Sequence, residues 1–105
     1  MLDKATVREI ARDYSDEVRK IIDPVKIILF GSYITGTPNE WSDIDIAVLV
    51  NGFEGNWLDA NAKLFGLKWE DRFLDIEPHL LDETQDPSGF VEYIIKTGEV
   101  IYQTI

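Results

Sequence analysis

One short segment of the sequence carries acidic residues at the spacing of a metal site. Asp43 and Asp45 alternate with isoleucines in "SDIDIAVLV", residues 42–50, which otherwise has the composition of a hydrophobic strand. Side chains two residues apart on a strand leave the same face with Cα atoms about 6.5 Å apart, so their carboxylates can converge on one or two hard cations. Mg²⁺ takes such oxygen ligands and links them to substrate phosphates. The segment is therefore a candidate magnesium site, with two ions expected, although such pairs also arise by chance in a chain with twenty acidic residues.

A third carboxylate would strengthen this site, and the segment "DIE" offers two candidates, Asp75 and Glu77. Both belong to a strand expected over residues 72–81, where alternation puts them on one face. If that strand lies beside residues 43–50, either side chain can join the cluster. Alternation alone does not choose between them.

A Gly-Ser pair, Gly31 and Ser32, precedes the acids by ten residues and follows the apolar run "VKIILF", residues 25–30. Glycine lets the backbone approach a ligand closely, and the N–H groups with the Ser32 hydroxyl can hold phosphates, above all where a helix begins. The alternative is a plain tight turn. The Gly-Ser pair lies at one end of the loop and the acids lie at the other. This combination favours a phosphate site.

His79 is the only histidine in the chain. Its ordinary pKa is close to neutrality, so it is a conceivable catalytic base. A structural role at the end of the third strand is the stronger expectation.

The elements that must position these residues follow from hydrophobic periodicity. An amphipathic first helix has apolar residues at helical spacing from Val7 to Ile22 and stops before Pro24. Thr6 and Glu9 stand at capping-box spacing, and Asp3 would cap an earlier start. The remaining elements are strand 25–30, strand 42–50, helix 57–70 capped by Asn56, strand 72–81 with Pro78 marking an edge or exit, helix 89–97 ended by Gly98, and a short terminal strand in 100–105.

This order predicts an α+β (mixed α/β) fold, in which helices cover a small mixed β-sheet. The 105 residues, 45% of them apolar, suit a single domain over 1–105. Twenty acidic against ten basic residues give a net charge of −10, which disfavours extended contact with nucleic acid but not a nucleotide held through a metal ion. The sequence has no cysteine and no evident signal or membrane segment, so a cytoplasmic protein is expected.

Gly31-Ser32, ten intervening residues and Asp43-Ile44-Asp45 resemble the Gly-Ser-x10-Asp-x-Asp signature of the DNA polymerase beta-like nucleotidyltransferase superfamily. The chain is similar to its minimal nucleotidyltransferase (MNT) branch, of the MntA-like antitoxin type, over nearly its whole length. The resemblance implies the polymerase beta palm-like fold, in the order α-β-α-β-α-β-α. It also implies that Gly31, Ser32 and Ser42 hold nucleotide phosphates.

The same resemblance implies that Asp43 and Asp45 bind Mg²⁺ and are catalytic together with a third acid. Glu77 is favoured for that role because its Ile-Glu-Pro-His context is similar to the family's third-acid strand, and Asp75 is the second choice. One departure stands out, since many members carry arginine just after Gly-Ser, where this chain has Tyr33. Two alternatives follow: Arg72, Lys68 or a residue of a partner supplies the missing positive charge, or the affinity for the nucleotide is low.

The implied activity is transfer of a nucleoside monophosphate, AMP from ATP above all, to an acceptor hydroxyl. The implied partner is a HEPN-type protein in a toxin–antitoxin pair, whose tyrosine would be the acceptor. Two alternatives stay open: a catalytically weak antitoxin that masks its partner by binding, and a small-molecule adenylyltransferase. The second fits less well because such enzymes usually carry a further helical domain. The sequence also leaves a homo-oligomer open.

Overall fold

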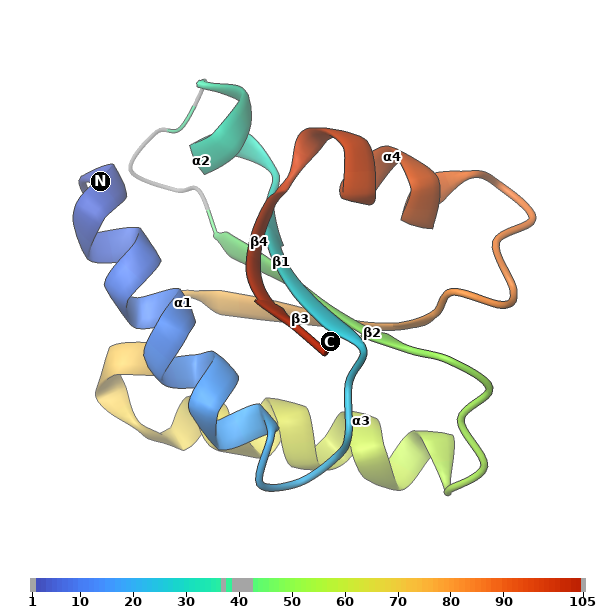
Figure 1. Ribbon diagram of the computed structural model, residues 1–105. Helices are drawn as coiled ribbons and strands as arrows, with labels where there is room; N and C mark the ends of the chain where they lie inside the picture. Colours follow the sequence, from blue (N-terminus) through green and yellow to red (C-terminus); the bar gives the residue numbers. More distant parts are fainter. Residues whose placement is uncertain (1, 37, 39–42, 105) are drawn as a thin grey trace.

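In the computed structural model, which describes residues 2–36, 38 and 43–104, one four-stranded sheet lies between helices (Figure 1). The strand order is β3-β2-β1-β4. The elements are α1 (Lys4–Val18), β1 (Lys26–Phe30), α2 (Ser32–Thr35), β2 (Ile44–Val50), α3 (Trp57–Gly66), β3 (Ile76–Asp82), α4 (Phe90–Thr97) and β4 (Glu99–Gln103), with two 3₁₀ turns, Leu67–Trp69 and Asp71–Phe73, between α3 and β3.

The sheet is mixed, as the sequence predicts. β1 pairs antiparallel with both β2 and β4, whereas β2 pairs parallel with β3. β1 and β2 occupy the centre and are almost entirely buried, which is why their sequences are nearly continuous apolar runs. β3 is an edge strand, a position that tolerates Pro78 because an edge leaves one side of the strand unpaired.

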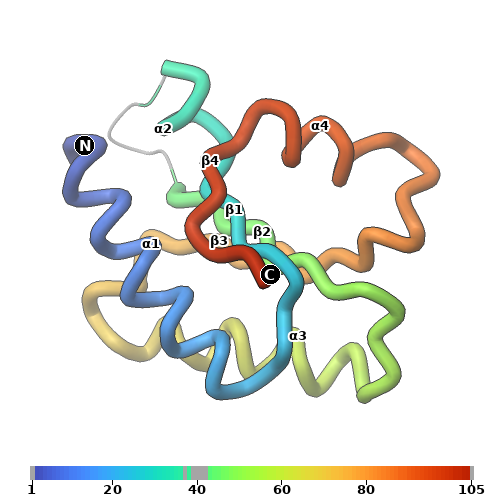
Figure 2. Tube along the Cα trace, viewed as in Figure 1, coloured from blue at the N-terminus to red at the C-terminus, as the bar shows by residue number. Residues whose placement is uncertain are grey.

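The two faces of the sheet carry separate apolar cores. Figures 1 and 2 show α1 and α3 on one side of the sheet and α4 on the other. Ile44, Ile46, Val48 and Val50 belong to the larger core with α1 and α3, whereas Ala47 and Leu49 pack with α4. The predicted alternation of the second strand is therefore confirmed. Among the described residues, no helix is both long and apolar enough to cross a membrane.

The first helix takes the earlier of its two expected starts and ends sooner than predicted. It begins at Lys4, where the Asp3 carboxylate accepts the Thr6 N–H at 2.7 Å, so Asp3 rather than Thr6 is the cap. It ends at Val18, before Ile21 and Ile22, because the next residues form tight turns that close on the carbonyls of the last helical turn. The helix is shifted toward the N-terminus but keeps its apolar face.

The segment between β2 and β3 also corrects the sequence-based boundaries. Asn56 caps α3 as predicted, accepting the Asp59 N–H at 2.9 Å, but the helix ends at Gly66 rather than residue 70. The predicted strand over 72–81 begins only at Ile76, since the preceding residues form 3₁₀ turns that bury Phe73. The Phe73 ring packs edge-on against Tyr14 of α1, 5.2 Å between centroids. Because the Phe73 ring is buried against α1, residues 71–73 form a 3₁₀ turn where the sequence predicts extended strand.

Tyr14 joins α1 to α3 through one buried hydrogen bond. Its ring is fully buried, and its hydroxyl donates to the Leu64 carbonyl at 2.8 Å. Burial raises the pKa of this phenol, so the group stays neutral at any ordinary pH. We expect Tyr14→Phe to lower the free energy of unfolding by about 1 kcal/mol, measured by urea denaturation, because the Leu64 carbonyl loses this donor. Tyr93→Phe at an exposed site is the control, and equal losses in both variants would contradict the assignment.

Asp82 organises the turns at the far end of β2 and β3. Its carboxylate accepts the Gly52 and Phe53 N–H groups, each at 3.2 Å, and both the hydroxyl and the N–H of Thr84. These bonds, those from Thr84 first, lower the pKa of Asp82 from 3.8 to about 2.

Because the folded-state pKa of Asp82 is depressed, its contribution to stability is present above about pH 4 and is lost as the pH falls toward 2. We therefore expect wild type to be more stable than Asp82→Asn at pH 6, with the difference shrinking between pH 4 and 2. Urea unfolding curves across this range measure it. A difference that does not change with pH would contradict the assignment.

Candidate active site

Three side chains from β2 and β3 meet on the face of the sheet that α4 partly covers. Parallel register pairs Asp45 with Glu77, and Ala47 with His79. One ligand atom each from Asp45, Glu77 and His79 lies within 4.8 Å of the others, and we call this group the Asp45–Glu77–His79 cluster. Asp45 and His79 are half-buried and Glu77 is exposed, so the cluster is open to solvent. Antiparallel register also places Asp45 opposite Phe30, the last residue of β1.

Gly31 lies directly against the cluster. Its backbone has φ +84° and ψ −156°, a region in which only glycine is comfortable. A Cβ atom built at Gly31 would overlap Oδ2 of Asp45. The Gly-Ser turn therefore lies immediately beside the acidic group, and α2 begins at Ser32.

His79 is the member that the sequence reasoning did not assign to the site. Its Nε2 lies 3.2 Å from Oδ1 of Asp45, and its ring meets Phe30 at 5.1 Å between centroids and 62° between planes. It also lies in the middle of β3 rather than at its end. The signal was present in the sequence, because Glu77-x-His79 puts the imidazole and the carboxylate on one face of a strand.

The other predicted site residues lie around this cluster. Asp43 is exposed and directly precedes β2, and its carboxylate does not belong to the group of three. Asp75 is exposed in the turn before β3, where its backbone carbonyl accepts the Ile44 N–H at 2.7 Å. The geometry thus brings Glu77, and not Asp75, to Asp45. Ser42 lies outside the described residues.

The structure explains why a tyrosine, Tyr33, follows Gly31 and Ser32. Tyr33, which stands where many family members carry arginine, is buried, and its hydroxyl accepts the Leu2 N–H at 3.4 Å. Arg72 and Lys68, the side chains that could replace the charge of that arginine, have other neighbours in the structure. Arg72 pairs with Asp13 and Glu70 at 3.3 and 3.0 Å, and the Lys68 ammonium lies 5.7 Å from the centre of the Phe65 ring.

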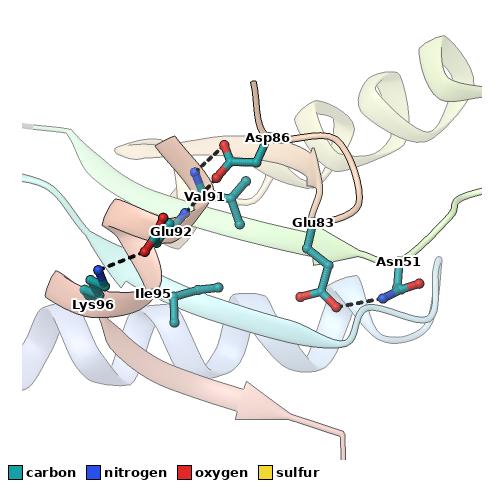
Figure 3. A pocket seen from close by; sticks show the side chains of 7 residues that line it. All are labelled: Asn51, Glu83, Asp86, Val91, Glu92, Ile95 and Lys96. Carbon is teal, nitrogen blue, oxygen red and sulfur yellow. Dashed lines mark hydrogen bonds and ion pairs between the residues drawn. The ribbon is translucent and has the colours of Figure 1, made fainter. Parts of the chain in front are cut away.

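A pocket of about 320 Å³ lies beyond the opposite ends of β2 and β3 (Figure 3). Its polar groups pair with one another: Asn51 donates to Glu83 at 2.8 Å, and Asp86 accepts the Val91 and Glu92 N–H groups at 3.0 Å each. The Asp86 carboxylate thereby caps the first turn of α4. The pocket shares no residue with the Asp45–Glu77–His79 cluster, and its polar contacts serve the fold.

The residues of the cluster fit a divalent cation. Asp45 and Glu77 offer carboxylate oxygens from adjacent strands, and the exposure of Glu77 leaves an entry path for an ion. The glycine at position 31 leaves room beside Asp45 that a side chain would fill. A divalent cation held by carboxylates reverses the local charge and can bind a phosphate group there.

The sequence matches the family profile of "Polymerase beta, Nucleotidyltransferase" over residues 7–104, so the chain belongs to this nucleotidyltransferase family. No curated protein sequence matches the chain. The mixed sheet, its helices and the acids beside the Gly-Ser turn all agree with this membership.

Solved structures of similar fold include toxin–antitoxin complexes, among them an MntA–HpeT pair and a HEPN toxin bound to its MNT antitoxin. A candidate nucleotidyltransferase from Sulfolobus solfataricus superposes with a TM-score of 0.64 at 19% identity, over 95% of this chain and 83% of that one. A toxin–antitoxin complex with AMP-PNP gives 0.64 at 28% identity, over 89% and 73%. The complex of a tri-AMPylated HEPN toxin with its MNT antitoxin from Shewanella oneidensis gives 0.58 at 25%, over 92% and 73%.

Proposed function

We propose that this protein transfers AMP from ATP to a hydroxyl group of a HEPN-type partner protein, as the antitoxin of a toxin–antitoxin pair. The observation that carries the proposal is the side-by-side position of Asp45 and Glu77 beside the Gly31 backbone, in a chain of the nucleotidyltransferase family. The tri-AMPylated HEPN toxin among the similar complexes supports the choice of nucleotide and acceptor.

In the proposed reaction the acceptor oxygen attacks the α-phosphorus of ATP, the bond from that phosphorus to the oxygen leading to the β-phosphate breaks, and pyrophosphate leaves. The backbone at Gly31 and Ser32, with Ser42, binds the triphosphate. Asp43, Asp45 and Glu77 hold the divalent cation, which we take to be Mg²⁺ or a related ion. Bound there, it neutralises phosphate charge and aligns the reacting groups. Exposed Glu77 is available to accept the proton of the acceptor hydroxyl.

The direct test incubates the purified protein with α-labelled ATP, a divalent cation and any HEPN-type protein that is encoded in the neighbouring reading frame. We expect label on the partner and release of pyrophosphate in equal amounts. Mass spectrometry of the labelled partner identifies the acceptor, for which a tyrosine is expected. A tight complex without label would overturn the proposed transfer.

The second candidate function, inhibition of the partner by binding alone, is favoured by one observation. Tyr33 is buried where many family members carry a phosphate-neutralising arginine. The absence of label together with a stable complex supports this candidate. A third outcome, pyrophosphate release without any protein acceptor, would indicate a small-molecule substrate.

A further inference from the structure

We propose that His79 is a metal ligand, and that the Asp45–Glu77–His79 cluster takes a transition-metal dication of the series from Mn²⁺ to Zn²⁺ in preference to Mg²⁺. The inference rests on the proposed function in one respect, since it names the cation of the same site. It rests otherwise on the position of one imidazole nitrogen.

The distances within the cluster suit a shared ion. Two ligand atoms that each lie about 2.1 Å from one cation are about 3 Å apart at a right angle and about 4.2 Å apart on opposite sides. His79 Nε2 and Asp45 Oδ1 are 3.2 Å apart, and the whole group spans at most 4.8 Å. Glu77 is exposed, so its long side chain can close the remaining gap by rotation.

The imidazole is held with Nε2 toward the carboxylates. The edge-to-face contact with Phe30 supports the ring from β1, on the far side of β2, and the pairing of β3 with β2 fixes the backbone of His79. Nε2 donates a hydrogen bond to Asp45 when it carries the proton, and it presents a lone pair to a cation when the proton is on Nδ1. The same position therefore serves both the metal-free and the metal-bound protein.

The donor set determines which cation is preferred. Mg²⁺ favours an all-oxygen octahedral shell and exchanges it reluctantly, whereas imidazole nitrogen suits iron, nickel, copper and zinc, and affinity for a site of nitrogen and oxygen ligands rises from Mn²⁺ toward Cu²⁺. Two carboxylates and one imidazole make a mixed site. The imidazole nitrogen of such a site increases its affinity for transition metals but increases its affinity for Mg²⁺ only slightly.

The test uses Mn²⁺ as the probe on the protein without a histidine tag, nucleotide or partner. The chain contains one histidine and no cysteine, so an imidazole nitrogen coupled to bound Mn²⁺ in pulsed electron paramagnetic resonance identifies His79. We expect that coupling, together with a dissociation constant for Mn²⁺ at least about tenfold below that for Mg²⁺. Bound Mn²⁺ without a coordinated nitrogen, equal affinity for the two ions, or no Mn²⁺ binding would overturn the inference.

Two variants separate coordination from a purely structural role. His79→Gln removes the nitrogen coupling and weakens Mn²⁺ binding at least about tenfold, with a smaller effect on Mg²⁺. His79→Asp supplies oxygen in place of nitrogen, so the preference for Mn²⁺ over Mg²⁺ narrows even if the affinity for both ions rises. Glu83→Gln, in the pocket at the opposite end of the strands, keeps wild-type binding. Circular dichroism verifies the fold of each variant, and unchanged Mn²⁺ affinity in folded His79→Gln overturns the proposal.

The metal-binding experiment and the transfer assay can refute the two proposals separately. Mn²⁺ held by His79 in a protein that transfers no AMP refutes only the proposed function. Transfer with Mg²⁺ by a protein whose bound Mn²⁺ shows no nitrogen coupling refutes only the inference on His79.

Discussion

Asp45→Asn is expected to lower the rate of AMP transfer at least about a hundredfold and to weaken divalent-cation binding. Replacing even a residue that supports a metal ligand costs about 10–100-fold, and Asp45 is placed to be a ligand itself. Asn keeps the size of the side chain and an oxygen that can accept from His79, so the fold is expected to persist. Single-turnover transfer rates and Mn²⁺ titration measure the two effects.

The matched control for Asp45→Asn is Glu83→Gln, which also removes one negative charge but lies in the pocket away from the cluster. If both variants lose transfer equally, the loss reflects overall charge rather than metal coordination. Asp43→Asn adds a second comparison, because Asp43 is exposed and outside the group of three. Full transfer by Asp43→Asn would remove this residue from the proposed ligands, whereas a loss as large as that of Asp45→Asn would keep it.

Gly31→Ala is expected to have the second large effect, on both stability and the site. Backbone conformations reserved for glycine cost other residues about 1–3 kcal/mol, and the new methyl group would displace the Asp45 carboxylate. We expect a lower free energy of unfolding in urea and, in the fraction that remains folded, loss of most Mn²⁺ affinity.

Gly36→Ala is the control for backbone strain alone. Gly36 also has a positive φ, +88°, but among the residues that the structure describes no atom lies within 4 Å of a Cβ built there. It should lose about 1–2 kcal/mol of stability and retain metal binding. Retained Mn²⁺ affinity in Gly31→Ala would show that the close approach to Asp45 does not matter for the site.

Much of the fold follows from local features of the sequence. The apolar runs that became β1 and β2, the alternation of Asp45 with isoleucines, and the Asn56 cap are properties of neighbouring residues. One boundary that was wrong depends on a distant contact: Phe73 leaves the predicted strand because its ring is buried against Tyr14, fifty-nine residues earlier in the chain. Periodicity cannot register such a contact.

The candidate site also has features that follow from the sequence and features that depend on the tertiary structure. The sequence by itself determined which residue types are available, the alternation of Asp45 with isoleucines, and the glycine that precedes Ser32. The expected shared face of Asp43 and Asp45 stays a prediction, because Asp43 precedes β2 and lies outside the group of three. Only the tertiary structure decided that β3 pairs parallel with β2, in a register that brings Glu77 rather than Asp75 to Asp45 and adds His79 to the carboxylates. Alternation along one strand fixes the face of each side chain, but a register between strands is set by the packing of the whole sheet.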